Sequence, residues 1–285
     1  MDCKEIVITN GNLTATISSI GGELISYKKN NKESIWTGDA SFWKGHAPIL
    51  FPFCGGLING DLYLKNKKYD MPKHGFIRFH EFEVVDKKDN QVTLCFKENK
   101  ETKKIYPYDF TFVVTYTLTD VLNIKYEITN NSKEDMYFNV GSHEGYLLDD
   151  DFNNYHLEFN EEEDLKSIVL EGPLLSHESI DLGSKTRVFP LKYEDYKVDA
   201  LVFPHIKSKR ITLVNNSTGP VIDLEFDKAD NLVLWTVPQA RFICIEPWNG
   251  LHDYVDSELD IKKKNNVTIL SSGNAYAFSH TIRIR

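Results

Sequence analysis

The chain has 285 residues, of which 41% are hydrophobic and 26% charged, a composition typical of a folded globular protein with a sizeable core. Its net charge of -9 at pH 7 argues against nucleic acid or an anionic membrane as a partner, because both bind basic surfaces. The first residues lack the order of a signal peptide, and no apolar run is long enough to span a bilayer. Cys3, Cys54, Cys95 and Cys244 show no Cys-x-x-Cys spacing, so we expect free thiols in a cytoplasmic protein.

Alternation of apolar and polar residues dominates the sequence and predicts half-buried strands. It is clearest along 110–118 and 122–128, and the break at Thr119-Asp120 predicts an antiparallel hairpin between these segments. In chain order, the predicted strands are 6–9, 13–17, 23–28, 82–85, 92–96, 110–118, 122–128, 136–140, 156–159, 211–214, 221–226, 232–236, 242–246 and 275–284. Very little helix is expected. The pattern predicts an all-β protein, a large antiparallel β-sandwich or barrel, in a single domain spanning 1–285.

The stretch from His46 to Val84 breaks the alternation. It combines prolines, glycines and aromatic residues, a composition that suits ordered irregular loops better than ladder strands. Functional groups tend to lie on such loops when a rigid sheet supports them.

Three groups that could transfer a proton near neutral pH stand out. They are His74 in "KHGFIR", His143 in "VGSHEGY" and Glu246 in "ICIEPW", each at the end of a predicted strand or just inside one. Two imidazoles and one carboxylate form an acid/base site. The sequence indicates neither a metal site nor a cofactor.

The motifs around these residues, taken in order, resemble the aldose 1-epimerase (galactose mutarotase) family, and within it the LacX-like bacterial branch. The matching blocks are "GGELISYK", "ILFPFCGGLINGDLYLKNKKYDMPKHGFIR", "NVGSHEGYLL", "DALVF" and "LVLWTVPQARFICIEPWNG". The resemblance implies a galactose mutarotase-like supersandwich that interconverts the α and β anomers of an aldose without a cofactor.

The resemblance also implies roles for individual residues. Glu246 would be the base that takes the proton of the anomeric hydroxyl, His143 the acid on the ring oxygen, and His74 a second imidazole bonded to the sugar. The same resemblance implies three substrate-binding residues: Asp199, Arg78 and Trp248, the last as an aromatic face for sugar C–H groups.

Each residue also has a structural interpretation. Glu246 would be costly to bury unpaired, so it either pairs with an arginine such as Arg78 or Arg241 or, as we favour, faces a polar pocket. An ion pair with Glu81 or Glu83 would explain Arg78 equally well. The remaining histidines, including His252, are expected to be structural.

Two positions depart from the family pattern. Gly56 stands where the family commonly has an arginine that grips the sugar. Glu144 follows His143 where most members have proline, and its negative charge should favour protonated His143.

Other functions remain open. One is a non-catalytic carbohydrate-binding or sensing protein. Another is a hexose-phosphate mutarotase, which would require two or more cations, such as Arg78, Arg187 or Arg241, at the cleft rim. A glycosidase would use Glu246 opposite Asp199, and a metal hydrolase lacks a third ligand in the sequence. The expected partner is a small sugar, and the chain is a monomer or a homodimer.

Overall fold

The computed structural model describes residues 4–197 and 199–285, so Cys3 lies outside the described residues. Its largest element is a nine-stranded sheet in which all paired strands are antiparallel. In spatial order this sheet contains β16 (Thr186–Pro190), β13 (Tyr155–Glu163), β18 (Arg210–Asn215), β19 (Gly219–Phe226), β23 (Ala275–Ile284), β10 (Leu122–Asn130), β9 (Phe110–Leu118), β8 (Gln91–Lys97) and β7 (Glu83–Lys88).

A six-stranded sheet forms the second large layer. It contains, in order, β12 (Gly145–Leu147), β21 (Phe242–Trp248), β20 (Asn231–Trp235), β17 (Leu201–Phe203), β14 (Lys166–Glu171) and β15 (Leu174–Asp181). Smaller sheets are formed by β1 (Glu5–Asn10), β2 (Leu13–Ser18), β3 (Leu24–Lys29) and β4 (Lys32–Glu33), by β5 (Asp61–Leu64) with β6 (Lys67–Asp70), and by β11 (Met136–Phe138) with β22 (Thr268–Leu270).

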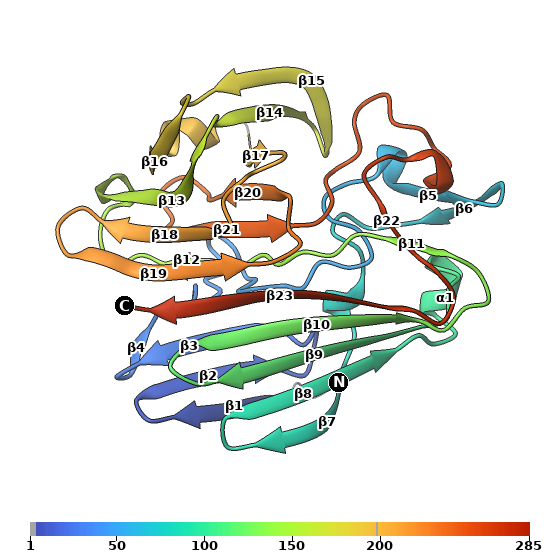
Figure 1. The fold of residues 1–285 in the computed structure, drawn as a ribbon, viewed down its shortest axis with the longest axis horizontal. Coiled ribbons are helices and arrows are strands. Elements are labelled where there is room, and N and C mark those ends of the chain that lie inside the picture. The colour runs from blue at the N-terminus through green and yellow to red at the C-terminus, as the bar shows by residue number, and fades with distance from the viewer. Residues whose placement is uncertain (1–3, 198) are drawn as a thin grey trace.

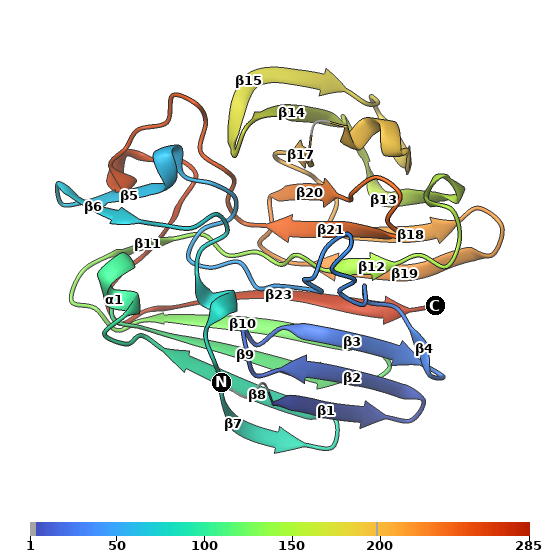
Figure 2. The ribbon, with the colours of Figure 1, turned by 180° about the vertical axis from the view of Figure 1, so that it is seen from behind.

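Strand β23 runs through the middle of the molecule and joins its two halves (Figure 1). Below it in this view are β10, β9 and β8, and the four-stranded sheet packs against β8 and β9. Above it are β19 and the strands of the six-stranded sheet, an arrangement that the opposite view confirms (Figure 2). The two large sheets therefore enclose a common core.

The predicted alternation sets the register of this core. Along β9 every second side chain, from Phe110 to Leu118, is buried, and β10 repeats the pattern in antiparallel register. These side chains form one hydrophobic cluster with the inward-facing residues of β21 and β20, such as Ile245 and Leu232. Each fully buried apolar side chain of this size stabilises the fold by about 1.5–3 kcal/mol.

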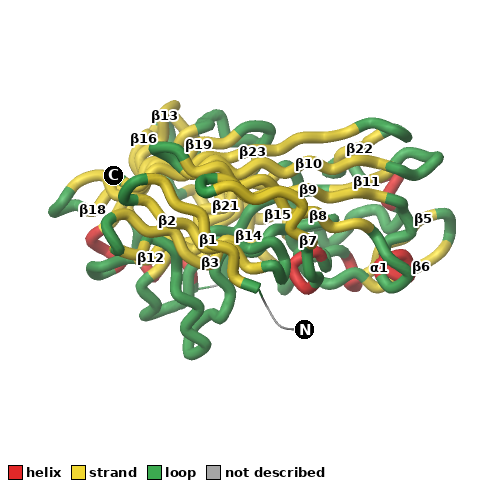
Figure 3. Tube along the Cα trace, turned by 90° about the horizontal axis from the view of Figure 1, so that it is seen from below, coloured by secondary structure: helices red, strands yellow, loops and turns green. Residues whose placement is uncertain are grey.

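The all-β prediction is confirmed, and each predicted strand overlaps an observed one. In the described residues the only α-helix is α1 (Thr102–Ile105), and the other helical pieces are short 3-10 turns (Figure 3). The sequence missed β14, β15 and β16 because their mixed polar residues break the alternation, and it missed the hairpin of β5 and β6 inside the loop-rich stretch. The single-domain organisation stays a prediction.

None of the helices in the described part of the chain has the length and apolar character needed to cross a bilayer. Cys54, Cys95 and Cys244 are free thiols, as expected.

Candidate active site

A cavity of about 270 Å³ lies on the face of the six-stranded sheet that points away from the common core. All six site residues predicted from the sequence line it. The lining residues are Trp43, Lys73, His74, Arg78, His143, Leu170, Asp199, Ala200, Val233, Trp235, Glu246, Trp248 and His252. Its volume is close to the lower end of the range of small-molecule pockets, which begins near ~300 Å³.

Glu246 and His143 face each other at the centre of this cavity. On β21 the side chains alternate, so that Ile245 enters the common core while Glu246 points to the other face of the sheet. Oε1 of Glu246 lies 3.5 Å from Nδ1 of His143, and the two residues are only 1% and 8% exposed. Among the described residues the carboxyl of Glu246 has no arginine partner, so the polar-pocket interpretation of this residue holds.

Burial controls the protonation of this pair. Burial raises the pKa of Glu246 well above its usual value. The negative charges of Glu144 and Asp199 add to this rise, and the positive charge of Lys73 opposes it. Burial, together with the positive charges of Arg78 and Lys73, lowers the pKa of His143 to about 3. Both shifts therefore favour the neutral forms, a carboxylic acid beside an imidazole.

This protonation state differs from the expectation of an ionised Glu246 beside a protonated His143. The sequence does not reveal how completely both groups lose water, and desolvation disfavours the charged form of each.

His74 is held in one orientation by the backbone around it. It has a left-handed φ of +67°, and its Nδ1 accepts a hydrogen bond of 3.1 Å from the backbone N–H of Gly55. Because burial lowers its pKa well below the usual value, with His143 as the next cause, the ring is neutral and carries its proton on Nε2. His74 can therefore donate one hydrogen bond to a ligand, and its ring centroid lies 5.6 Å from that of His143.

Gly75 makes this geometry possible. Its φ is +70°, and a Cβ built on it would lie 2.1 Å from the carbonyl oxygen of Phe51. Only glycine fits at this position, directly after His74.

Two cations line the cavity beside the acid/base pair. The guanidinium of Arg78 donates a hydrogen bond of 3.1 Å to the carbonyl of Lys73 and lies over the ring of Phe79. Within the part of the chain that the structure describes, neither Arg78 nor Lys73 forms an ion pair, so the alternative pairing of Arg78 with Glu81 or Glu83 is not found. Both positive charges are available to a ligand.

Three indole rings contribute to the walls. Trp43 stacks on the ring of His143 with centroids 5.1 Å apart, and Trp235 meets His143 edge to face at 5.8 Å. Trp248 is completely buried, and its indole N–H donates to the carbonyl of Ser142. Trp43 and Trp235 are partly exposed and present more ring surface to the cavity than Trp248 does.

His143, Cys244 and Glu246 also bring one nitrogen, one sulfur and one oxygen within 4.8 Å of one another. Metal binding by cysteine needs the thiolate, whereas burial raises the pKa of Cys244 well above its usual value, and Glu246 and Glu144 add to this rise. The cluster therefore suits proton transfer better than metal ligation.

Comparison with known proteins agrees with this fold. The family model Aldose 1-epimerase matches residues 4–277. The chain belongs to the aldose 1-epimerase family. It is 30% identical over 279 residues to the plasmid-encoded protein LacX of Lactococcus lactis, covering 92% of this chain and 93% of that protein. A match to a putative glucose-6-phosphate 1-epimerase of Salmonella typhimurium, 26% identical, covers 49% of this chain and 50% of that protein.

Solved structures show the same architecture. A galactose mutarotase-like protein from Lactobacillus casei is 30% identical and superimposes with a TM-score of 0.93, covering 99% of this chain and 100% of that one. A galactose mutarotase related enzyme from Lactobacillus acidophilus, 26% identical, gives a TM-score of 0.92 over 99% of this chain and 97% of that one. The fold is therefore galactose mutarotase-like.

The structure explains both departures of this epimerase-family chain from the family pattern. A Cβ on Gly56 would lie 2.7 Å from the carbonyl oxygen of Pro173, so an arginine would not fit there. Glu144 points away from the cavity and lies 2.7 Å from His280. The expectation that Glu144 favours protonated His143 is therefore wrong: burial and the nearby cations lower the pKa of that imidazole instead.

Sequence reasoning missed seven lining residues: the apolar Leu170, Ala200 and Val233, and also Lys73, Trp43, Trp235 and His252. Lys73 directly precedes His74, a position that could have drawn attention to it. His252 was expected to be structural, and its Nδ1 does lie 2.8 Å from the carbonyl of Pro173, but its ring also lines the cavity. No signal in the sequence marks Trp43, because its loop carries no motif.

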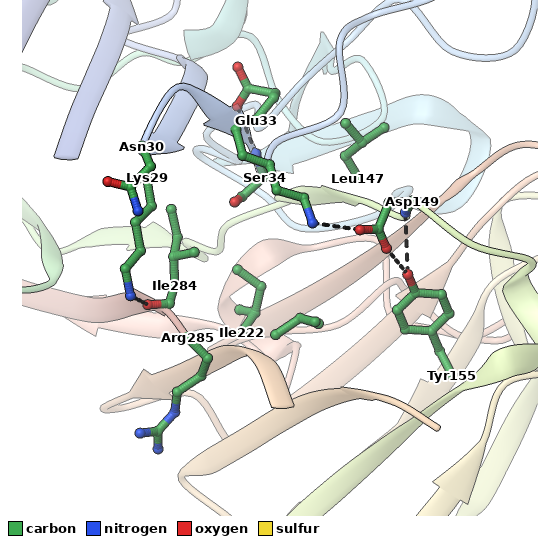
Figure 4. Close-up of a pocket in the computed structure, with 12 residues that line it drawn as sticks. Lys29, Asn30, Glu33, Ser34, Leu147, Asp149, Tyr155, Ile222, Ile284 and Arg285 are labelled. Carbon is green, nitrogen blue, oxygen red and sulfur yellow. Dashed lines mark hydrogen bonds and ion pairs between the residues drawn. The ribbon is translucent and has the colours of Figure 1, made fainter. Parts of the chain in front are cut away.

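A second cavity, of about 380 Å³, lies where the four-stranded sheet meets β12, β13, β19 and β23 (Figure 4). Its polar groups largely satisfy one another: Asp149 pairs with Lys32 and accepts a hydrogen bond from Tyr155, and Lys29 donates to the carbonyl of Ile284. No histidine lines it, so acid/base chemistry belongs to the first cavity.

Proposed function

We propose that the chain is a mutarotase, an aldose 1-epimerase that interconverts the α and β anomers of a hexose. The observation that carries this proposal is the distance of 3.5 Å between the Glu246 carboxyl and the His143 imidazole, inside a cavity of suitable size for one small sugar. The anomeric hydroxyl and the ring oxygen are both attached to C1, so an acid and a base placed this close can reach both atoms at once.

In the proposed reaction Glu246, as the carboxylate, takes the proton of the anomeric hydroxyl while His143, as the imidazolium, protonates the ring oxygen. The bond between C1 and the ring oxygen breaks, C1 becomes an aldehyde, and rotation about the C1–C2 bond presents its other face. Ring closure reverses both proton transfers and restores the pair.

The ionic form of the pair can be reached without a change in the net charge of the cavity. The neutral resting pair becomes carboxylate and imidazolium when one proton crosses from Glu246 to His143, which leaves the net charge of the cavity unchanged. Lys73 stabilises the carboxylate, since its positive charge lowers the pKa of Glu246. Each well-placed proton-transfer group accelerates such a step by roughly 10²- to 10⁴-fold.

The neighbouring residues would hold the sugar in place. His74 donates a hydrogen bond from Nε2, Asp199 accepts from sugar hydroxyls, and Arg78 donates to them. Trp43 and Trp235 present ring surface to the C–H groups of the sugar, and Trp248 packs beside His74 and His252.

Exchange spectroscopy tests the proposal directly. Saturation of one anomeric proton of glucose or galactose should transfer to the other anomer in the presence of the protein, and Glu246→Gln should abolish this transfer with the fold intact. A wild-type protein that binds sugar without accelerating exchange would instead support the carbohydrate-binding or sensing alternative. Release of sugar from an aryl glycoside would point to a glycosidase.

A hexose phosphate is a second candidate substrate, because Lys73 and Arg78 line one cavity without acidic partners. Two converging cations are the requirement for gripping a phosphate. Arg187 and Arg241 do not line the cavity.

A comparison of Lys73→Met with the wild type on glucose 6-phosphate and on glucose decides between the two substrates. If phosphate is bound, KM rises at least 10-fold for the phosphosugar only. An equal change for both sugars would exclude this candidate.

A further inference from the structure

A buried pair of side chains lies directly behind the two groups proposed as acid and base. Glu144 follows His143 in the chain, and because neighbouring side chains point to opposite faces, its carboxylate enters the core between the two large sheets. There, Oε1 of Glu144 lies 2.7 Å from Nε2 of His280, and each residue is only 1% exposed.

His280 is a rigid anchor for this contact. It lies on β23, which is hydrogen-bonded on one side to β10 and on the other to β19, so it belongs to the interior of the nine-stranded sheet. Glu144 itself directly precedes β12 of the six-stranded sheet. The contact between Glu144 and His280 therefore ties the segment that carries His143 to the opposite sheet.

Backbone hydrogen bonds fix both ends of this segment, at Gly141 and Gly145, with lengths of 3.0 Å from Leu50 N–H to the carbonyl of Gly141 and 2.8 Å from Gly145 N–H to the carbonyl of His46. The backbone bonds between these ends, towards β21, are longer. Ser142 N–H donates to the carbonyl of Pro247, and Ile245 N–H donates to the carbonyl of Glu144, both at 3.3 Å. Backbone hydrogen bonds are most often near ~2.9–3.0 Å, so these two are long. The side-chain contact of Glu144 is shorter than either bond.

The pair is also a costly feature of the core. Oε2 of Glu144 and Nδ1 of His280 are buried without a hydrogen-bond partner among the described residues. Replacement of a buried polar pair by apolar residues of similar volume is often neutral or stabilising. Stability of the fold is therefore a weak reason for the pair, and its place behind His143 and Glu246 suggests another one.

We propose that Glu144 and His280 are positioning residues, which fix His143 opposite Glu246 and keep a buried negative charge behind the Glu246 carboxyl. This inference rests on the proposed mutarotation. The direction of the charge effect agrees with it, since Glu144 contributes to the raised pKa of Glu246.

The charge of Glu144 has other titratable neighbours. The groups that face it are His280 from β23, Tyr116 from β9, Tyr126 from β10, Tyr146 from β12, and Cys244 and Glu246 from β21. Burial raises the pKa of all three tyrosines and of the cysteine well above the usual values, and Glu144 adds to each rise. These four groups therefore stay neutral near pH 7, and Glu246 is the group whose titration Glu144 should change.

Two variants test the proposal with anomer exchange as the assay. Glu144→Gln keeps the volume of the side chain and removes its charge, so the pKa of Glu246 should fall and the basic limb of kcat/KM, where Glu246 loses its proton, should move to lower pH. The double variant Glu144→Leu/His280→Leu should be as stable as the wild type or more stable, yet its kcat/KM should fall about 10-fold, which corresponds to ~1.4 kcal/mol of lost transition-state stabilisation. Rates and pH profiles like those of the wild type in both variants would overturn the proposal.

The matched control is Glu163→Gln. Glu163 is another buried carboxylate, but it accepts hydrogen bonds from the backbone of Lys207 and Ser208, and it does not line the cavity. This variant should lose stability and keep the wild-type pH profile.

A readout that needs no activity separates this inference from the proposed function. Carboxyl ¹³C NMR of Glu246 should show a lower titration midpoint in Glu144→Gln than in the wild type, and an unchanged midpoint would refute the charge effect. A wild-type protein without anomer exchange would refute the mutarotase proposal instead. If the double variant does not fold, the pair is required for stability and the positioning argument fails.

Discussion

Replacement of Glu246 by glutamine should make the protein more stable above neutral pH while it removes activity. In the unfolded chain Glu246 ionises near its ordinary value of 4.5, whereas in the folded protein burial raises its pKa well above this value. Folding therefore takes up a proton in this range, and the contribution of Glu246 to stability is lost as the pH rises towards the folded pKa. Each pH unit inside this window costs the wild type about 1.4 kcal/mol.

The structure indicates how large the gain from Glu246→Gln should be. The amide of glutamine stays neutral at every pH, so the variant escapes the loss of about 1.4 kcal/mol per pH unit that the carboxyl of Glu246 causes in the wild type. We expect the variant to exceed the wild type by at least about 1.4 kcal/mol at pH 8, and by less at pH 5. For a protein of this size, a gain of 1 kcal/mol raises Tm by roughly 2–4 °C.

Thermal unfolding at several pH values measures this effect, and anomer exchange measures the expected loss of at least ~100-fold in kcat. Asp199→Asn is a useful control, because Asp199 lines the same cavity but is only partly buried. It removes a charge from the same cavity and keeps the buried carboxyl of Glu246. A Glu246→Gln protein that is less stable than the wild type at pH 8 would refute the reasoning that Glu246 is a desolvated, protonated acid.

Three further predictions follow from other contacts. His143→Asn should make stability depend less on pH below pH 6.5. In the wild type the pKa of His143 is lowered to about 3, so between pH 6.5 and this value the unfolded chain binds a proton that the folded protein does not, and stability falls by about 1.4 kcal/mol per pH unit. Denaturant titrations at pH 7 and pH 5 measure this difference between the variant and the wild type. Gly75→Ala should fail to give a stable fold, because the new Cβ would lie 2.1 Å from the carbonyl oxygen of Phe51. Gly172→Ala is the matched control: it has a similar positive φ but open space around it, so thermal unfolding should show a loss of only about 1 kcal/mol in stability. Lys264→Met should cost about 3–5 kcal/mol in chemical denaturation, because it leaves the buried carboxylate of Asp253 without its cation.

The sequence predicted the frame of the fold better than its periphery, for a physical reason. Strands such as β9 and β10 have one buried and one exposed face, and this alternation is visible in the sequence. Strand β15 is exposed along most of its length, so no apolar period marks it. The hairpin of β5 and β6 lies in a stretch rich in proline and glycine, where short strands and loops have similar compositions.

Residues were easier to predict than their protonation. The motifs identified His74, His143 and Glu246, and the structure brings all three to one cavity. Protonation depends on the depth of burial and on cations from distant segments, such as Lys73 beside Glu246, and neither can be read from spacing. The side to which Glu144 turns was also out of reach, because its partner His280 is 136 positions away in the chain.

Glu246 is the residue where the local rules of folding are most clearly broken, and this is informative about function. It lies in a run of buried side chains, "FICIEPW", where an apolar residue would be cheaper. Natural sequences break such rules mainly at functional sites. The cost is limited because the buried acid and imidazole can both be neutral, and a cycle that returns its proton never requires the cavity to change its net charge. A deeply buried pair is therefore compatible with a stable fold for mutarotation, whereas a reaction that leaves a net charge behind would need water or a counterion beside Glu246.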